Sequence, residues 1–214
     1  YYDMLSRNAF GNFRDLIEDV TLHPAMGVYL SMLVNEKPDP KKNIRPDENY
    51  AREMMQLFTI GLVQLNIDGT EKLDSEGKPL PTFDQEILES FAHVYTGWNY
   101  ADATSFGKAK RDDDNQIKAM QLYSSKHDQG PKTLLNGATL PADQSGTQDL
   151  NSALDNVFQH SNVGPFIVKQ LIQRLVTSNP SPAYVARIAA IFNDNGQGVR
   201  GDLGAVVKKI LLDV

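Results

Sequence analysis

The adjacent side chains His127 and Asp128 are the pair best suited to chemistry in this sequence. They lie in a polar stretch that directly precedes Lys132. An imidazole beside a carboxylate can act as a general base, as a metal ligand or as a pH-sensitive loop anchor. The structural alternative is a turn in which Asp128 accepts backbone N–H groups and Lys132 is solvated. If the pair forms a site, we expect it to line a concavity with Trp98 or with the helix that carries Glu53.

A metal ion at this pair would need ligands from elsewhere, because the side chains of adjacent residues diverge. His93, Glu53 and Glu89 are the residues that the fold could bring close. The sequence has no cysteine, which excludes disulfides, thiolate catalysis and cysteine-ligated zinc within it. It also lacks the HExxH arrangement of helical zinc hydrolases. We therefore assign no metal site, and the sequence identifies no cofactor.

A second candidate is the polar group Arg52 and Glu53 on a predicted helix. Glu48 precedes Arg52 by four residues, so the two side chains can pair on one helix face. We expect Arg52 to be charge-paired and at least partly buried. It would then either bind an anionic or sugar substrate or tie this helix to a neighbour, and the structural role is favoured.

Trp98 lies with Tyr95 and Tyr100 in an aromatic group at the end of another predicted helix. Aromatic faces stack on sugar rings, but they also close the edge of a core, which is the favoured interpretation. The resulting candidate site has His127, Asp128 and Glu53 as catalytic residues. Its substrate-binding residues are Arg52, Trp98 and Lys132.

Other polar residues have simpler explanations. His23 precedes Pro24 and is expected to cap a helix junction, whereas His160 is expected to end a helix as a partly cationic ring. The acidic run from Asp112 to Asp114 lacks the glycine of a calcium-binding loop, so a solvated loop is favoured.

The apolar spacing predicts a mainly α fold with about eight helices in a bundle-like array and one or two small β-hairpins. Residues 1–214 are interpreted as a single helical domain, with loop or hairpin excursions at 62–82 and 99–140. The pair Asn136-Gly137 predicts a hairpin with a type I′ turn. Thr82 to Gln85 has the pattern of a helix capping box, and Ser181 and Asp202 are expected to cap the last two helices. The helices are expected at 13–20, 24–33, 47–60, 82–97, 150–158, 165–175, 181–192 and 202–211.

Helical spacing also predicts which side chains are buried. The expected core residues are Met54, Met55, Phe58, Phe91, Tyr95, Phe166, Leu171, Val185 and Phe192.

Composition limits the class of protein. The 214 residues are 41% hydrophobic and carry a net charge of −6, which is typical of a globular chain and argues against non-specific nucleic-acid binding. No apolar run is long enough to predict a membrane span. Because the sequence begins at Tyr1 and ends within an apolar run, we expect it to be a fragment of a longer protein.

Several stretches together resemble a bacterial family known as domain of unknown function 1800. They are Asp47–Gly61, Tyr95–Trp98, His127–Lys132, Pro165–Pro182 and Gly201–Leu203. The resemblance implies a longer protein with an N-terminal part that would be a further partner of this segment. It also implies export, and hence a periplasmic or extracellular location with a possible protein partner at the cell envelope.

Two functions follow as hypotheses, and whether the protein is an enzyme stays open. The first is a binding or scaffold module at the cell envelope, since no complete catalytic set can be assembled from these residues. The second is a hydrolase acting on a polysaccharide or other polymer through His127 and Asp128 with Arg52 and Glu53.

Overall fold

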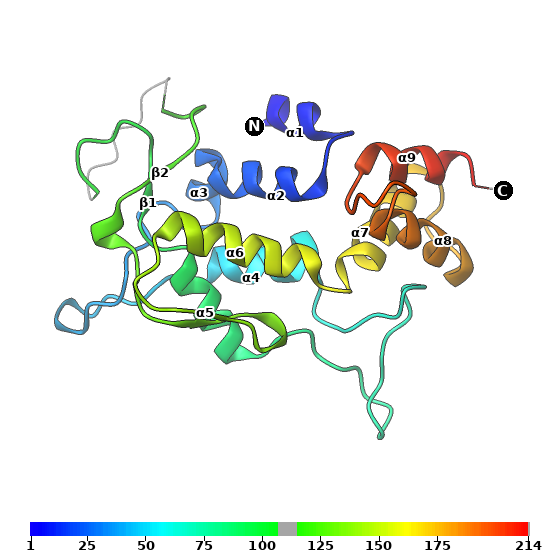
Figure 1. Ribbon diagram of the computed structural model, residues 1–214, viewed down its shortest axis with the longest axis horizontal. Helices are drawn as coiled ribbons and strands as arrows, with labels where there is room; N and C mark the ends of the chain where they lie inside the picture. The colour runs from blue at the N-terminus through cyan, green and yellow to red at the C-terminus, as the bar shows by residue number, and fades with distance from the viewer. Residues whose placement is uncertain (107–114, 214) are drawn as a thin grey trace. The chain divides into compact units, whose positions relative to one another are not determined.

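The computed structural model describes residues 1–106 and 115–213, and it confirms a mainly α fold. Within these residues there are nine α-helices and two small antiparallel sheets of two strands each (Figure 1). None of the described helices is long and apolar enough to cross a membrane. The helices are α1 (Tyr2–Asn8), α2 (Phe13–Leu22), α3 (Pro24–Tyr29), α4 (Asn49–Glu53), α5 (Gln85–Val94), α6 (Gly146–Gln159), α7 (Val163–Leu175), α8 (Pro182–Asn193) and α9 (Leu203–Leu211).

The strands are short and pair in two hairpin-like sheets. β1 (Trp98–Asn99) pairs with β2 (Gln121–Leu122), and β3 (Lys132–Thr133) pairs with β4 (Thr139–Leu140). Short helical turns complete the order: η1 (Pro40–Lys42), η2 (Met54–Thr59), η3 (Ser124–Lys126) and η4 (Leu135–Gly137).

The chain forms two compact units. Unit 1 comprises Tyr1, residues 17–54 and the described part of 83–156. Unit 2 comprises residues 2–16, 55–82 and the described part of 157–214.

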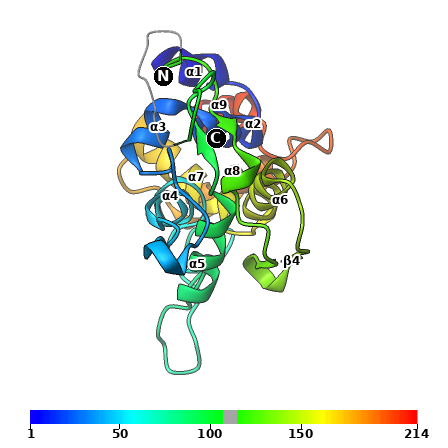
Figure 2. The ribbon, with the colours of Figure 1, turned by 90° about the vertical axis from the view of Figure 1, so that its left-hand side faces the viewer.

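Unit 1 is organised around α5, which packs against α4 and against β3 (Figure 2). The rings of Tyr50 and Tyr95 meet edge to face with centroids 4.9 Å apart, and Phe91 is fully buried beside them. The Tyr50 hydroxyl donates to Oγ1 of Thr21 at 2.6 Å. Burial raises the pKa of the Tyr50 phenol, so the residue is a neutral core side chain.

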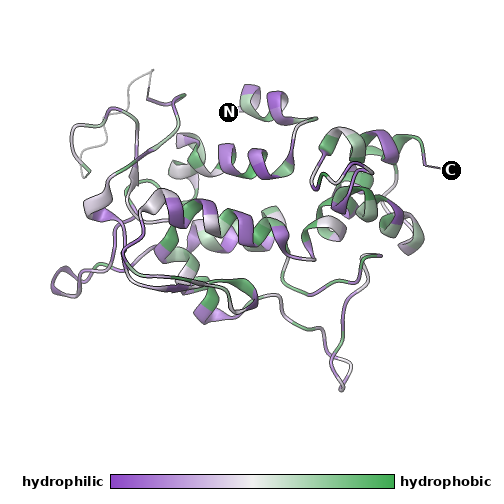
Figure 3. Ribbon diagram, viewed as in Figure 1, coloured by the Kyte–Doolittle hydropathy of each residue, from purple (hydrophilic) through white to green (hydrophobic). Residues whose placement is uncertain are grey.

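Unit 2 is organised around α8, which packs against α7 and α9. Phe192 on α8 is buried and lies edge to face against Phe13, with ring centroids 5.6 Å apart. The Arg200 guanidinium lies over the rings of Phe158 and Phe192, 5.4 and 5.3 Å from their centroids. In Figure 3 the α8 and α9 helices carry many hydrophobic residues, whereas the loop around η1 in unit 1 is mostly hydrophilic.

The helix predicted at 47–60 is shorter and irregular. α4 begins at Asn49 and continues into η2, whose six residues form a π-helical turn. The N–H groups of Ile60 and Gly61 both donate to the carbonyl of Met55, and Gly61 ends the segment with a φ of +73°. Six of the nine predicted core residues are buried, but Phe58, Phe166 and Leu171 are only half-buried.

Local capping signals were predicted with mixed success. Asp202 accepts from the N–H of Ala205, and Ser181 accepts from that of Tyr184, which confirms both caps. The capping box at 82–85 was wrong, because Asp84 caps α5 by accepting from the N–H of Ile87.

Of the two predictions for histidines at helix ends, the one for His23 is confirmed and the one for His160 is wrong. His23 caps α3 through Nδ1, as expected, and accepts from the N–H of Ala25 at 3.1 Å. The cationic ring expected at His160 was wrong: its Nδ1 accepts from the N–H of Asn162, and burial lowers its pKa. A ring nitrogen that accepts a hydrogen bond is unprotonated.

The Asn136-Gly137 hairpin is confirmed. Asn136 and Gly137 both have positive φ, at +58° and +72°, as a type I′ turn requires, and β3 pairs with β4 in register on either side. Residues 62–82 form an irregular hairpin held by three isolated bridges, as expected of that excursion. The acidic run Asp112–Asp114 lies outside the described residues.

Candidate functional site

His93 and Asp128 form a side-chain pair in unit 1. Nδ1 of His93, in the last turn of α5, lies 2.8 Å from Oδ2 of Asp128 in the loop before β3. The His93 side chain is 33% exposed and the Asp128 side chain 15% exposed, so solvent reaches both. Among the described residues, the other ring nitrogen of His93 has no hydrogen-bond partner. Proximity of His93 to Asp128 was one of the arrangements that the sequence left open.

Hydrogen bonds to its side chain and from its backbone fix the position of Asp128. Its Oδ1 accepts from the N–H of Gly130 at 2.6 Å, and its own N–H donates to Oγ1 of Thr96 at 2.9 Å. The hydrogen bond from His93 is the main reason that the pKa of Asp128 falls to about 2, with burial opposing it. Asp128 is therefore an ionised, oriented acceptor for the imidazole at neutral pH.

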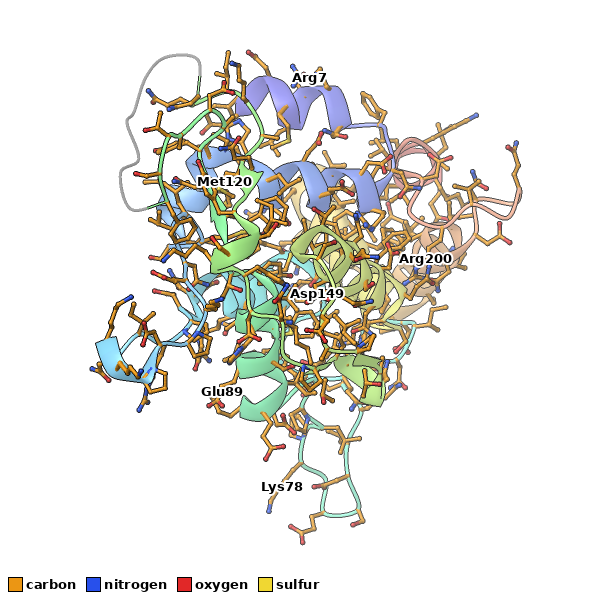
Figure 4. The ribbon with its side chains drawn as sticks, turned by 60° about the vertical axis from the view of Figure 1, so that its left-hand side comes forward. Arg7, Lys78, Glu89, Met120, Asp149 and Arg200 are labelled. Atoms are coloured by element: carbon orange, nitrogen blue, oxygen red, sulfur yellow. The ribbon has the colours of Figure 1, made fainter. Side chains whose placement is uncertain are left out.

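His127 does not project toward solvent but belongs to a buried charge centre with Lys132 and Asp149. Nε2 of His127 lies 3.1 Å from Oδ2 of Asp149, and Nζ of Lys132 lies 2.6 Å from the same oxygen. All three side chains are almost completely buried. Figure 4 shows Asp149 at the start of α6, surrounded by side chains. Lys132 is thus a buried ion-pair partner, and the solvated lysine of the turn hypothesis was wrong.

Two glycines make room for His127, one beside its backbone and one beside its ring. A Cβ on Gly97 would lie 2.8 Å from the backbone nitrogen of His127, and Gly97 has a φ of +89°. A Cβ on Gly146, at the start of α6, would lie 2.9 Å from Nδ1 of the ring. The helix start and the chain after α5 therefore approach His127 more closely than any residue with a side chain would allow.

Arg52 and Glu53 do not join this centre. Arg52 pairs with Glu48 at 2.9 Å, which confirms the expected partner. The Arg52 side chain is 43% exposed and that of Glu48 32%, so the pair is a surface contact rather than a buried anion clamp. Glu53 is half-buried, and its Oε2 has no hydrogen-bond partner among the described residues.

Trp98 is a core residue. It is buried in β1, and its indole nitrogen has no hydrogen-bond partner within the described part of the chain. Burial of this kind confirms the core-edge interpretation and removes the exposed ring face that sugar stacking needs.

Two surface pockets meet at His93 and share Glu89. One has a volume of about 220 Å³ and the other about 340 Å³. Figure 4 labels Glu89 on α5, one helical turn before His93. The first pocket is lined by Pro38, Arg45, Pro46, Glu48, Glu89, Ala92 and His93. The second is lined by Asp84, Glu86, Ile87, Glu89, Ser90, His93, Pro131, Lys132 and Thr133.

Among the charged residues that line these pockets, acidic side chains predominate. Four carboxylates border them, whereas the Lys132 ammonium is paired with Asp149 and Arg45 has no ion pair among the described residues. Within the described residues, no cluster of three or more metal-ligating side chains is present. What the arrangement offers is a set of hydrogen-bond acceptors and an imidazole oriented by a carboxylate, which is suited to ligand binding and to proton transfer.

Asp149 is the member of the buried centre that sequence reasoning missed. It stands in the first turn of a helix, where an acidic residue is ordinarily explained by the helix dipole. Its partners Lys132 and His127 lie 17 and 22 residues away in the sequence, so no local sequence pattern predicts the contacts.

The comparisons with known proteins identify a family. The family model described as "Protein of unknown function (DUF1800)" matches residues 1–214, which is the whole chain. No curated protein and no solved structure matches it.

Proposed function

Because this chain belongs to the DUF1800 family, whose function is unknown, we propose a role from its own geometry: a binding module that holds a basic partner segment on the acidic face of α5. The observation that carries the proposal is the pair of adjoining pockets around His93 and Glu89. Export, which the family resemblance implies, would place this module and its partner at the cell envelope.

Charge complementarity supports a basic partner. Glu86 and Glu89 are exposed on α5, and Asp84 and Glu48 lie at the edges of the same pockets. Opposite charge across an interface steers association and selects the partner, while each exposed pair adds little affinity. A lysine- or arginine-rich segment would meet several acceptors at once, with the His93 ring between them.

The test is a binding titration of the full chain with a synthetic lysine-rich peptide. Replacing Glu86 and Glu89 together by Gln should weaken binding roughly three- to thirtyfold, since each exposed charge pair is worth up to about 1 kcal/mol. Added salt should weaken binding by the wild type more than by the variant. The matched control is Glu71→Gln together with Glu76→Gln, which removes the same two charges from exposed sites in the 62–82 hairpin of unit 2. Equal loss of affinity in the control and in the α5 variant would reject the α5 face.

A hydrolase is the second candidate, and the orientation of His93 by Asp128 is the observation that favours it. With Nδ1 directed to the carboxylate, the other ring nitrogen can accept a proton from water. In this proposal His93 takes the place of the buried His127 as the base beside Asp128. Arg52, which was expected to bind substrate, is paired with Glu48. Hydrolysis of a polysaccharide by the wild type but not by His93→Gln, with equal melting temperatures, would establish this activity. Turnover that survives the substitution would exclude His93 as its base.

A further inference from the structure

The His127 ring is placed between two acceptor oxygens. Its Nδ1 lies 3.0 Å from the backbone carbonyl oxygen of Thr96, and its Nε2 lies 3.1 Å from Oδ2 of Asp149. A carbonyl oxygen carries no hydrogen, so Nδ1 must be the donor in the first contact. A neutral imidazole has only one N–H, and that hydrogen is therefore already used.

The Thr96 hydroxyl offers no alternative hydrogen to the ring. Oγ1 of Thr96 is 3.3 Å from Nδ1, but it donates to the carbonyl of His93 at 2.8 Å and accepts from the N–H of Asp128 at 2.9 Å. A hydroxyl has one hydrogen, and the shorter bond to the His93 carbonyl takes it.

The Lys132 ammonium is likewise fully used. Its three hydrogens match three acceptors: Oδ2 of Asp149 at 2.6 Å, the carbonyl of Asp128 at 2.7 Å and the carbonyl of Gly130 at 2.9 Å. This arrangement favours a charged lysine opposite a charged aspartate. The contact between Asp149 and Nε2 of His127 still lacks a hydrogen if the ring is neutral.

We propose that His127 is an imidazolium, with both ring nitrogens protonated, beside the ion pair of Lys132 and Asp149. The second ring proton then fastens the loop that bears Asp128. With the ring doubly protonated, both of its nitrogens donate to the oxygens that face them. The centre of His127, Lys132 and Asp149 then has a net charge of +1 inside unit 1.

Two charged groups face the ring within the buried charge centre: Asp149 from α6 contacts Nε2, and Lys132 from β3 contacts the same carboxylate oxygen. The His93–Asp128 pair of α5 and the loop is connected to the ring through Thr96. Loss of the proton would leave a ring lone pair opposite the Thr96 carbonyl or the Asp149 carboxylate, which is repulsive. The loop would loosen from Thr96, and Asp128 would lose its fixed position beside His93. His127 is thus a positioning residue, and its effect on ligand binding rests on the proposed function, whereas its protonation does not.

The experiment is a nitrogen–hydrogen correlation spectrum of the histidine rings in the full chain, labelled with ¹⁵N. The four histidines provide internal references, because His23 and His160 both accept backbone hydrogen bonds at Nδ1 and should show one ring N–H each. His127 should show two ring N–H signals at pH 7, where a free imidazole is mostly neutral. A single ring N–H on His127 at that pH would overturn the proposal. Assignments come from His23→Asn, His160→Asn and His93→Gln.

A pH titration tests the positioning role in the same sample. As the pH rises, loss of the second His127 proton should coincide with a change in the His93 ring signals. His93 signals that stay constant while His127 loses its proton would reject the fastening role. In Asp149→Asn the second proton should be absent at pH 7, whereas Glu86→Gln should keep it. A doubly protonated ring in folded Asp149→Asn would contradict the assigned acceptor, and if that variant does not fold, the wild-type titration decides.

Discussion

Nδ1 of His93 lies 2.8 Å from Oδ2 of Asp128, although the two residues are 35 positions apart in the sequence. The neighbouring residue, His127, has its ring directed away from this pair and toward Asp149. Adjacent His127 and Asp128 thus have different partners, because consecutive side chains on an extended backbone diverge. The motif that suggested one site contributes to two: a half-exposed pair at the pockets and a closed charge centre beneath it.

Asp128 makes stability depend on pH in the acid range. Its folded-state pKa of about 2 lies below the value near 3.9 expected for an unfolded chain. The ionised carboxylate therefore stabilises the fold fully above about pH 5, and the contribution disappears as the pH falls toward 2. We expect Asp128→Asn to be less stable than the wild type by about 1–2 kcal/mol at pH 6, with the difference vanishing near pH 2. Urea unfolding at a series of pH values measures this, and a difference that is constant with pH would contradict it.

Lys132 should be essential for stability because it neutralises a buried carboxylate. Lys132→Met leaves Asp149 without its ammonium partner, which typically costs about 3–5 kcal/mol. Removing both charges with Lys132→Met and Asp149→Leu should recover part of that loss, since no buried carboxylate is left unpaired and the His127 ring, without Asp149 as acceptor, becomes neutral. Denaturant midpoints of the single and double variants are the measurement. A single variant that loses less than about 1 kcal/mol would show that water reaches Asp149.

Arg52 should matter little for stability. Its pair with Glu48 is a half-exposed contact between residues four apart on one helix, and such pairs contribute about 0.3–0.5 kcal/mol. We expect Arg52→Ala to shift the free energy of unfolding by less than about 1 kcal/mol and the shift to shrink in high salt. A loss comparable to that of Lys132→Met would mean that Arg52 has a buried partner.

His23 should make the fold less stable in mild acid. Its ring accepts a hydrogen bond at Nδ1, and burial lowers its pKa, so the neutral form is the folded one. The cap is complete above the unfolded value near 6.5 and is lost as the pH falls through the lower folded value. His23→Asn offers an acceptor that does not titrate. Between about pH 7 and 5 the wild type should lose up to about 1 kcal/mol more than His23→Asn. The matched variant keeps His160, so titration of that ring cancels in the comparison.

Features set by a few consecutive residues were the ones that the sequence could predict. Asn136-Gly137 specified its turn because positive φ at two successive residues suits few other pairs. The sequence also identified three caps, at His23, Ser181 and Asp202. Each accepts a hydrogen bond from an N–H only two or three residues ahead, so the cap and its donor belong to one local pattern. The capping box failed at Thr82, whose hydroxyl donates to the carbonyl of Gly61 instead.

The candidate site depended on contacts between distant segments, and there sequence reasoning was weaker. His127 rather than Asp128 is buried because the start of α6 lies against it. Gly146 of that helix leaves room for the His127 ring. The π-helical turn of η2 also left no local sign, because Met54 and Met55 fit a regular apolar stripe equally well. For His127 the tertiary partner, rather than the local pattern, fixed the outcome.

Thr96 touches both histidine centres, through its hydroxyl and through its carbonyl. Shared contacts of this kind make the energies of two sites non-additive, with coupling free energies of about 0.5–3 kcal/mol. The shared residue lies between His127 and Asp128 in this network, since Thr96 contacts the ring of the first and the N–H of the second. We therefore expect substitutions at His93 and at His127 to have non-additive effects on the free energy of unfolding, because both residues share hydrogen bonds with Thr96.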